Sequence, residues 1–135
     1  MAAADTLLPG MDLYEYQGKQ LFSRFGIPVS DGALATTPAE ARRAAQKIGG
    51  EVVVKAQVLV GGRGKAGGIK LAAGPEDAER EAAAIIGMDI RGHIVRRVWI
   101  ESASQIAREY YFSITLDRGA KRPLLMLTTA GGIEI

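Results

Sequence analysis

The chain has 135 residues, of which 47% are apolar and 24% are charged, and its formal net charge is +2. These values are typical of a compact globular domain of ordinary size. No apolar run approaches the ~20 residues that a membrane-spanning helix needs, which excludes a membrane span. The lack of cysteine and the single histidine exclude disulfides, cysteine nucleophiles and His-rich metal centres, and the expected compartment is the cytoplasm.

Basic charge is distributed in blocks along the chain. Residues 51–70 carry +3, residues 71–90 carry −4, and residues 91–100 carry +3 through Arg91, Arg96 and Arg97. Nucleic-acid binders present one sustained basic face with aromatic or motif support, and this pattern shows neither. Nucleic acid is therefore not an expected partner.

The first half of the chain predicts two helices with a short strand between them. Asp12 as N-cap and Glu15 at N3 predict a helix that ends at Gly26, with one apolar face formed by Leu13, Tyr16, Leu21, Phe22 and Phe25. Residues 29–35 fit a short strand. Thr37 as N-cap, followed by Pro38 and Glu40, predicts a second helix with an alanine-rich stripe (Ala41, Ala44, Ala45 and Ile48) that ends at Gly49-Gly50.

The second half begins with a buried strand, predicted for residues 51–60, that places Lys55 and Gln57 on the same face. A glycine-rich loop and a strand at 69–72 follow. A third helix opens at Gly74-Pro75 and closes at Gly87, and further strands are predicted at 94–101, 109–117 and 123–129. This order predicts an α+β fold, with a mixed or antiparallel sheet and flanking helices, rather than regular βαβ winding.

The glycine-rich loop, GGRGKAGG at 61–68, carries the strongest chemical signal. Glycines let backbone N–H groups approach an anion closely, and Arg63 and Lys65 add positive charge, so a phosphate chain is the expected guest. The loop does not fit the Walker A pattern, because Leu59 stands in place of the first glycine and Ala66 in place of the Ser or Thr. A dinucleotide motif needs a helix after the loop, and a kinase motif needs downstream catalytic residues. A hairpin lid over nucleotide phosphates remains the interpretation, with a flexible hairpin as the alternative.

Three further positions fit a nucleotide site. Lys55 lies in the apolar strand that leads into the loop, where a lysine is costly to bury unless it meets an anion or a carboxylate. Glu101 and Glu109 are predicted at the two ends of one turn, where they could accept from ribose hydroxyls or an adenine amino group, with Ser104 as a further contact. Each of these residues also has a simpler interpretation, as a lysine that reaches water or as solvated turn acids.

Three stretches resemble the β subunit of succinate–CoA ligase (succinyl-CoA synthetase). They are MDLYEYQGKQLFSRFGIPV at 11–29, VVVKAQVLVGGRGKAGGIKL at 52–71 and ESASQIAREYYFSITLDR at 101–118. The resemblance implies an ATP-grasp fold, with residues 11–135 as the front part of a longer nucleotide-binding domain and residues 1–10 as a disordered leader without a counterpart. It also implies that Lys55, Gly62, Arg63 and Gly64 contact nucleotide phosphates, and that Glu101, Ser104 and Glu109 contact the base and ribose.

The implied reaction converts succinate, CoA and ATP (or GTP) to succinyl-CoA, ADP (or GDP) and phosphate, through a phosphohistidine on a partner α subunit. By the same resemblance, the Mg²⁺ ligands lie beyond this chain, so this segment alone is expected to be inactive and to hold no catalytic residue. Two alternatives remain open: a malate–CoA ligase β subunit and a non-catalytic nucleotide-binding module.

Overall fold

The computed structural model describes residues 12–131, which form two units, the first ending at Ala103 and the second beginning at Ser104. The predicted leader, residues 1–10, lies outside the described residues. Among residues 12–131, no helix is long and apolar enough to cross a membrane.

The first unit is built on a four-stranded sheet in the order β1 (Gly32–Ala35), β6 (Val98–Ser102), β2 (Val52–Ala56) and β3 (Ile69–Ala72). Each neighbouring pair runs antiparallel. The prediction of an α+β fold with an antiparallel sheet is therefore confirmed.

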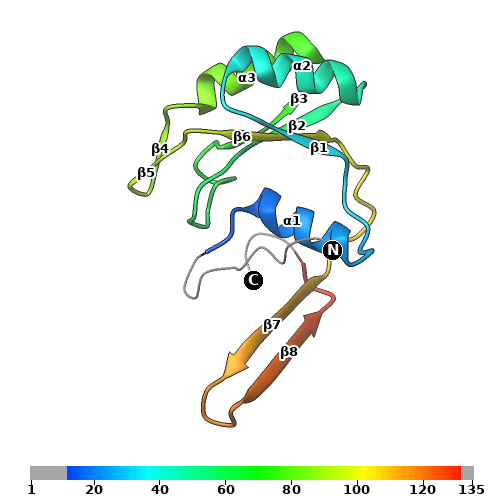
Figure 1. Ribbon diagram of the computed structural model, residues 1–135, viewed down its shortest axis with the longest axis vertical. Helices are drawn as coiled ribbons and strands as arrows, with labels where there is room; N and C mark the ends of the chain where they lie inside the picture. Colours follow the sequence, from blue (N-terminus) through cyan, green and yellow to red (C-terminus); the bar gives the residue numbers. More distant parts are fainter. Residues whose placement is uncertain (1–11, 132–135) are drawn as a thin grey trace, which may run out of the picture. The chain divides into compact units, whose positions relative to one another are not determined.

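Helices α2 (Pro38–Ile48) and α3 (Pro75–Ile85) cover one face of this sheet (Figure 1). The predicted cap of α2 is confirmed, because Thr37 Oγ1 accepts a hydrogen bond from the Glu40 amide at 3.2 Å. Small side chains let the two helices lie close to each other and to the sheet. The core holds Ala41, Ala44 and Ala45 of α2, Ala78, Ala82 and Ile85 of α3, and Val52, Val54, Ala56, Val98 and Ile100 of the sheet.

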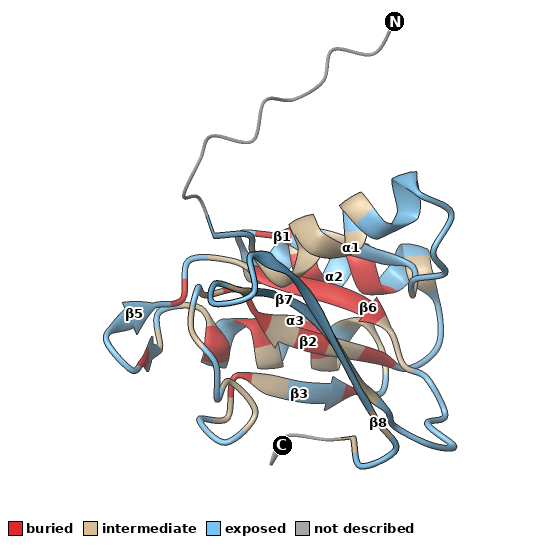
Figure 2. Ribbon diagram, turned by 90° about the horizontal axis from the view of Figure 1, so that it is seen from below, coloured by how far each residue is buried: buried red, intermediate tan, exposed pale blue. Residues whose placement is uncertain are grey.

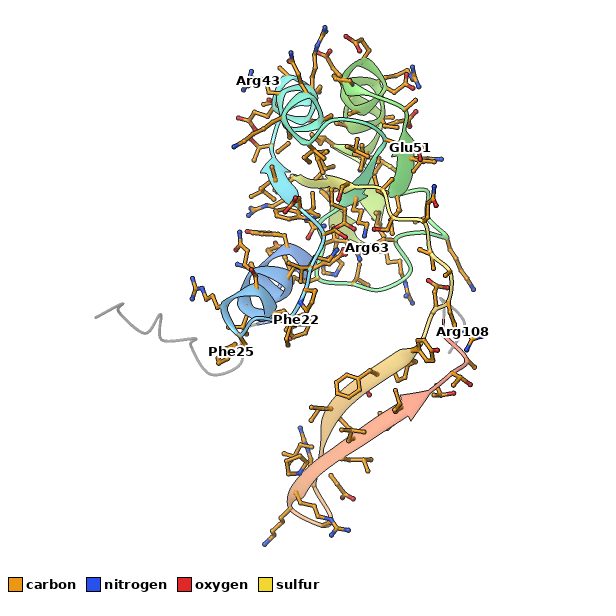
Figure 3. The ribbon with its side chains drawn as sticks, turned by 90° about the vertical axis from the view of Figure 1, so that its right-hand side faces the viewer. Phe22, Phe25, Arg43, Glu51, Arg63 and Arg108 are labelled. Atoms are coloured by element: carbon orange, nitrogen blue, oxygen red, sulfur yellow. The ribbon has the colours of Figure 1, made fainter. Side chains whose placement is uncertain are left out.

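Helix α1 (Glu15–Arg24) lies on the opposite face of the sheet (Figure 1), and the predictions made for it are wrong in two respects. Its N-cap is Tyr14 rather than Asp12, because Gln17 Oε1 accepts the Tyr14 amide at 2.9 Å. Its predicted apolar face packs on the sheet only in part: Tyr16 stacks on Trp99, with 5.8 Å between the ring centroids, but Phe22 and Phe25 are 52% and 78% exposed and lie away from the sheet (Figure 3). The helix also turns charged side chains toward the sheet.

Two strand predictions also need correction. The strand predicted at 51–60 ends at Ala56, where the chain leaves the sheet for the glycine-rich loop. The strand predicted to begin at Ile94 begins at Val98, and the short strands β4 (Asp89–Ile90) and β5 (His93–Ile94) precede it. A tight turn separates β4 from β5, with positive φ at Arg91 and Gly92.

The second unit is a hairpin of β7 (Tyr111–Asp117) and β8 (Arg122–Thr128). Cross-strand partners share a face of a hairpin, so Phe112, Ile114, Leu116, Leu125 and Leu127 lie on one face. Each of the five is more than half exposed. Most of both strands is coloured as exposed in Figure 2. The hairpin therefore presents a continuous apolar face.

Candidate nucleotide-binding site

Lys55 lies on the face of β2 that α1 covers. Its neighbours Val54 and Ala56 point into the core under α2 and α3, so strand alternation directs Lys55 to the other side. Lys55 is opposite Trp99 in the register of β2 and β6, and Glu101 lies one step diagonally along β6 on the same face. A long side chain bridges that diagonal, and Lys55 Nζ donates to Glu101 Oε1.

Glu101 lies next to the end of a strand, as the sequence predicts, but it is buried and is not a solvated turn acid. It lies within β6, where it is only 5% exposed, and it accepts hydrogen bonds from both Lys55 and Lys19. The Trp99 indole N–H donates to its Oε2 at 3.0 Å. Each oxygen of this buried carboxylate thus accepts a hydrogen bond from a cation or a neutral donor, as burial of an ion requires.

Helix α1 completes a cluster of five charged side chains: Glu15, Lys19, Lys55, Arg63 and Glu101. Glu15 lies 2.6 Å from Arg63 Nη1, 3.3 Å from Lys55 Nζ and 3.4 Å from Lys19 Nζ. Arg63 also donates to the Ala56 carbonyl at 2.8 Å, which ties the glycine-rich loop to the end of β2. With three cations and two carboxylates, the cluster has a surplus of one positive charge.

The pKa values of the cluster follow from this arrangement. Burial alone would raise the pKa of Glu15, but the charges of Arg63 and Lys55 outweigh it and lower that pKa to about 2. Burial likewise opposes the shift of Glu101, whose pKa is lowered by its hydrogen bonds from Lys19 and Lys55. For Lys55, burial would lower the pKa, but the two carboxylates raise it. Glu15, Lys55 and Glu101 therefore stay ionised at neutral pH.

The glycine-rich loop connects β2 to β3 as the predicted hairpin. Gly62 and Gly67 have φ of +83° and +81°, a left-handed region that glycine adopts without cost. The Gly68 amide donates to the Arg63 carbonyl at 2.8 Å, and its carbonyl accepts from the Ala56 amide at 2.7 Å. A Cβ on Gly68 would lie 2.7 Å from Ile90 Cδ1, so β4 packs directly against the loop.

The structure brings together some of the predicted site residues and leaves others apart. Lys55, Arg63 and Glu101 share the charged cluster, and Gly62 and Gly64 belong to the loop that holds Arg63. Ser104 and Glu109 are exposed residues of the second unit. Their predicted contact with base and ribose stays a prediction.

Sequence reasoning missed two members of the cluster, Glu15 and Lys19. Glu15 was assigned only to helix capping, and Lys19 to no role. Their spacing of four residues, which places both on one face of a helix, was the available signal. That signal indicates a shared face but does not show which surface the face meets.

Metal ligands are not grouped in the part of the chain that the structure describes. Within residues 12–131, no three His, Cys, Asp or Glu side chains come together in a way that could hold a metal ion. A Mg²⁺ ion that accompanies a nucleotide would thus find no ready protein cage among these residues.

A hairpin with a glycine-rich loop, next to a strand lysine on an antiparallel α+β sheet, is the arrangement that the resemblance implied. The ATP-grasp domain family matches residues 12–135. The chain belongs to the ATP-grasp family. The predicted fold class is therefore confirmed.

Relatives of this ATP-grasp chain include β subunits of succinate–CoA ligases. The chain is 61% identical over 125 residues to the ADP-forming subunit β of Rubrobacter xylanophilus and 52% identical to the GDP-forming subunit β of Thermus thermophilus. Each match covers 93% of this chain and 33% of the relative. The chain thus spans about a third of the length of the curated relatives it matches.

Solved structures share the ATP-grasp fold at lower identity. A dinucleotide-forming acetyl-coenzyme A synthetase 1 of Ca. Korarchaeum cryptofilum, solved with coenzyme A and Ca-AMPCP, matches with a TM-score of 0.74 and 22% identity over 86% of this chain and 52% of its own. The ATP citrate lyase of Methanothrix soehngenii, solved with citrate and coenzyme A, matches with a TM-score of 0.69 and 24% identity over 90% of this chain and 32% of its own. These two likenesses support the fold alone.

Proposed function

We propose that this chain is the nucleotide-binding segment of the β subunit of a succinate–CoA ligase. The observation that carries the proposal is the cationic cluster of Lys55, Lys19 and Arg63 beside a glycine-rich hairpin on an ATP-grasp domain. The identity of 61% to an ADP-forming β subunit, and of 52% to a GDP-forming one, supports this class of ligase.

In this proposal, Lys55 and Arg63 bind the phosphates of ATP or GTP, and the amides of Gly62 and Gly64 add donors to the same oxygens. Phosphate oxygens compete with Glu15 for these cations, and the surplus positive charge of the cluster favours the phosphates. Glu101 keeps Lys55 in place on the sheet. Binding fixes the position and direction of the terminal phosphate, which is the main contribution of a protein to phosphoryl transfer.

The proposed ligand contacts extend to the base and ribose. Ser104 and Glu109 are proposed to form hydrogen bonds with the base and ribose, as the resemblance implies. Glu101, which the resemblance places on the same side, acts on the nucleotide through Lys55, because both of its oxygens already accept from Lys55, Lys19 and Trp99. Mg²⁺ neutralises phosphate charge when it is bound, and its protein ligands are proposed to lie outside this chain.

The proposed reaction of the whole protein is succinate + CoA + ATP (or GTP) → succinyl-CoA + ADP (or GDP) + phosphate. The phosphoryl group passes through a histidine of the partner α subunit, and the compartment is the cytoplasm. His93 of this chain is no candidate for that role, because it is exposed in the short strand β5 and lies outside the charged cluster.

The test is the activity of the longer protein, assembled with its α subunit, that contains this segment. We expect Lys55→Ala to lower kcat/KM for the nucleotide by at least about tenfold, the cost of one charge-assisted hydrogen bond to phosphate. Lys70→Ala is the matched control, because Lys70 is an exposed lysine of β3. Assays with succinate or malate, and with ATP or GTP, define the substrates. Full activity in Lys55→Ala, or turnover of malate but not succinate, would contradict the proposal.

A further inference from the structure

A cavity of about 330 Å³ lies where the start of α1, the end of β2 and the segment from β5 to β6 meet. Arg96, Arg97 and His93 line it, together with Tyr14 and Gln57. None of the residues that line this cavity is acidic. Its chemistry thus differs from that of the charged cluster, which contains two carboxylates.

Arg97 is fixed through its backbone and through its side chain. Its backbone carbonyl accepts the Gln57 amide at 3.0 Å, which fixes the start of β6 against the end of β2. Its guanidinium carbon lies 5.2 Å from the centre of the Tyr14 ring, a cation–π contact. A guanidinium that is already positioned loses less side-chain freedom when it binds a ligand.

No carboxylate of residues 12–131 pairs with the arginines that line this cavity. Among the described residues, Arg96 and Arg97 form no ion pair, whereas Arg63 pairs with Glu15. Arg91 extends the basic segment toward the glycine-rich loop, since its Nη1 lies 3.7 Å from the position of a Cβ built on Gly62. The +3 block of residues 91–97 therefore reaches from the cavity, at Arg96 and Arg97, to the glycine-rich loop, at Arg91.

From these observations we propose that the cavity is a second anion site, specific for a phosphate dianion, with Arg96 and Arg97 as its ligands. Two guanidinium forks supply donors in the geometry that phosphate oxygens accept, and no carboxylate competes with them. A volume of about 330 Å³ holds a phosphate with several waters, each of which takes roughly 30 Å³. The dianion is either free phosphate or the end of a nucleotide polyphosphate. The proposal does not depend on the proposed function, because it uses none of the residues of the charged cluster.

The test is a titration of the 135-residue chain with inorganic phosphate. Binding is monitored through the NMR chemical shifts of the backbone amides of residues 92–97. We expect Arg96→Gln and Arg97→Gln each to weaken phosphate binding about tenfold, as for one charge-assisted contact, and added NaCl to weaken it in the parent. Arg43→Gln is the control, because Arg43 is an exposed arginine on α2, away from Arg63 and α1 (Figure 3). If loss of the contact with Tyr14 unfolds Arg97→Gln, Arg96→Gln alone tests the proposal, because Arg96 is exposed.

Two further measurements are needed. One distinguishes free phosphate from a nucleotide polyphosphate as the ligand of the cavity, and the other distinguishes this anion site from the proposed nucleotide site at the charged cluster. Competition by ADP indicates that the cavity accepts a nucleotide tail, and a lack of competition indicates free phosphate. In Lys55→Ala, phosphate binding at residues 92–97 should persist, whatever happens to nucleotide binding. The proposal is overturned if these amides do not respond to phosphate, or if Arg96→Gln binds phosphate as tightly as Arg43→Gln does.

Discussion

Glu15 should stabilise the first unit through its charge, and Glu15→Gln tests this directly. Its pKa falls from 4.5 to about 2, which corresponds to ~3 kcal/mol at about 1.4 kcal/mol per unit. The side chain is 23% exposed, and solvent screening reduces the figure, so we expect a loss of about 1–2 kcal/mol at pH 7. Glutamine keeps the size of the side chain and removes only the charge that Arg63 and Lys55 meet.

The pH dependence follows from the sign of the shift. Because folding lowers the pKa of Glu15, its stabilisation is fully present above pH 4.5 and is lost as the pH falls from there to about 2. Urea unfolding, followed by the fluorescence of the single tryptophan, Trp99, should show this loss in the parent and a smaller loss in Glu15→Gln.

Glu51→Gln is the control, because Glu51 is exposed and, among the described residues, its side chain forms no ion pair. It should change stability by less than about 0.5 kcal/mol. The reasoning is refuted if Glu15→Gln is as stable as the parent at pH 7, or if its stability falls as steeply as that of the parent between pH 4.5 and 2.

Other predictions concern the glycine-rich loop and the hairpin. Gly62→Ala should lower the free energy of unfolding by about 1–2 kcal/mol, measured in urea, because Gly62 has a positive φ. Gly61→Ala is the control and should have little effect, since a Cβ on Gly61 meets nothing within 4 Å. Equal losses in the two variants would contradict the loop conformation. Gly68→Ala should cost about 1–3 kcal/mol because its Cβ would collide with Ile90, and a neutral result would contradict that packing. The apolar face of β7 and β8 should cause the chain to self-associate, as measured by sedimentation velocity. Ile114→Lys, on that face, should reduce self-association more than Thr115→Lys, on the opposite face. A monomer at all concentrations would contradict this prediction.

Local sequence signals predicted most of the fold that surrounds α2 and α3. The cap at Thr37, the alanine stripe and Gly49 define α2 without help from the rest of the chain. The strand at Ile69–Ala72 is bounded by glycines and was predicted with its observed limits. These elements depend on residues close in sequence, which single-sequence patterns capture well.

Helix α1 shows where such patterns fail. Its apolar residues suggested a buried face, but Phe22 and Phe25 remain exposed, and the face toward the sheet carries Glu15 and Lys19. The stabilising contacts join this helix to Lys55 and Glu101, which are 40 or more residues away. Only the fold brings these charges together, so no local pattern could predict their pairing.

The site was predicted in part. Lys55 was selected because an apolar strand is an unusual place for a lysine, and the structure gives that lysine the carboxylate partners that its burial requires. Glu101 was expected at the end of a strand, beside a turn, and it does lie next to the end of β6, but its burial against Lys19 and Lys55 depends on contacts with distant segments that no local pattern shows. The basic residues at 91–97 were noted only as charge, because the cavity that they line is formed by segments distant in sequence.

The most direct test of the central claim is a calorimetric titration of the folded chain with Mg·ATP, alongside Lys55→Ala and the control Lys70→Ala. The account predicts that the parent and Lys70→Ala bind Mg·ATP, and that Lys55→Ala binds it at least about tenfold more weakly. Equal affinity in Lys55→Ala and in the parent would contradict the claim that Lys55 and the glycine-rich loop form a phosphate-binding site.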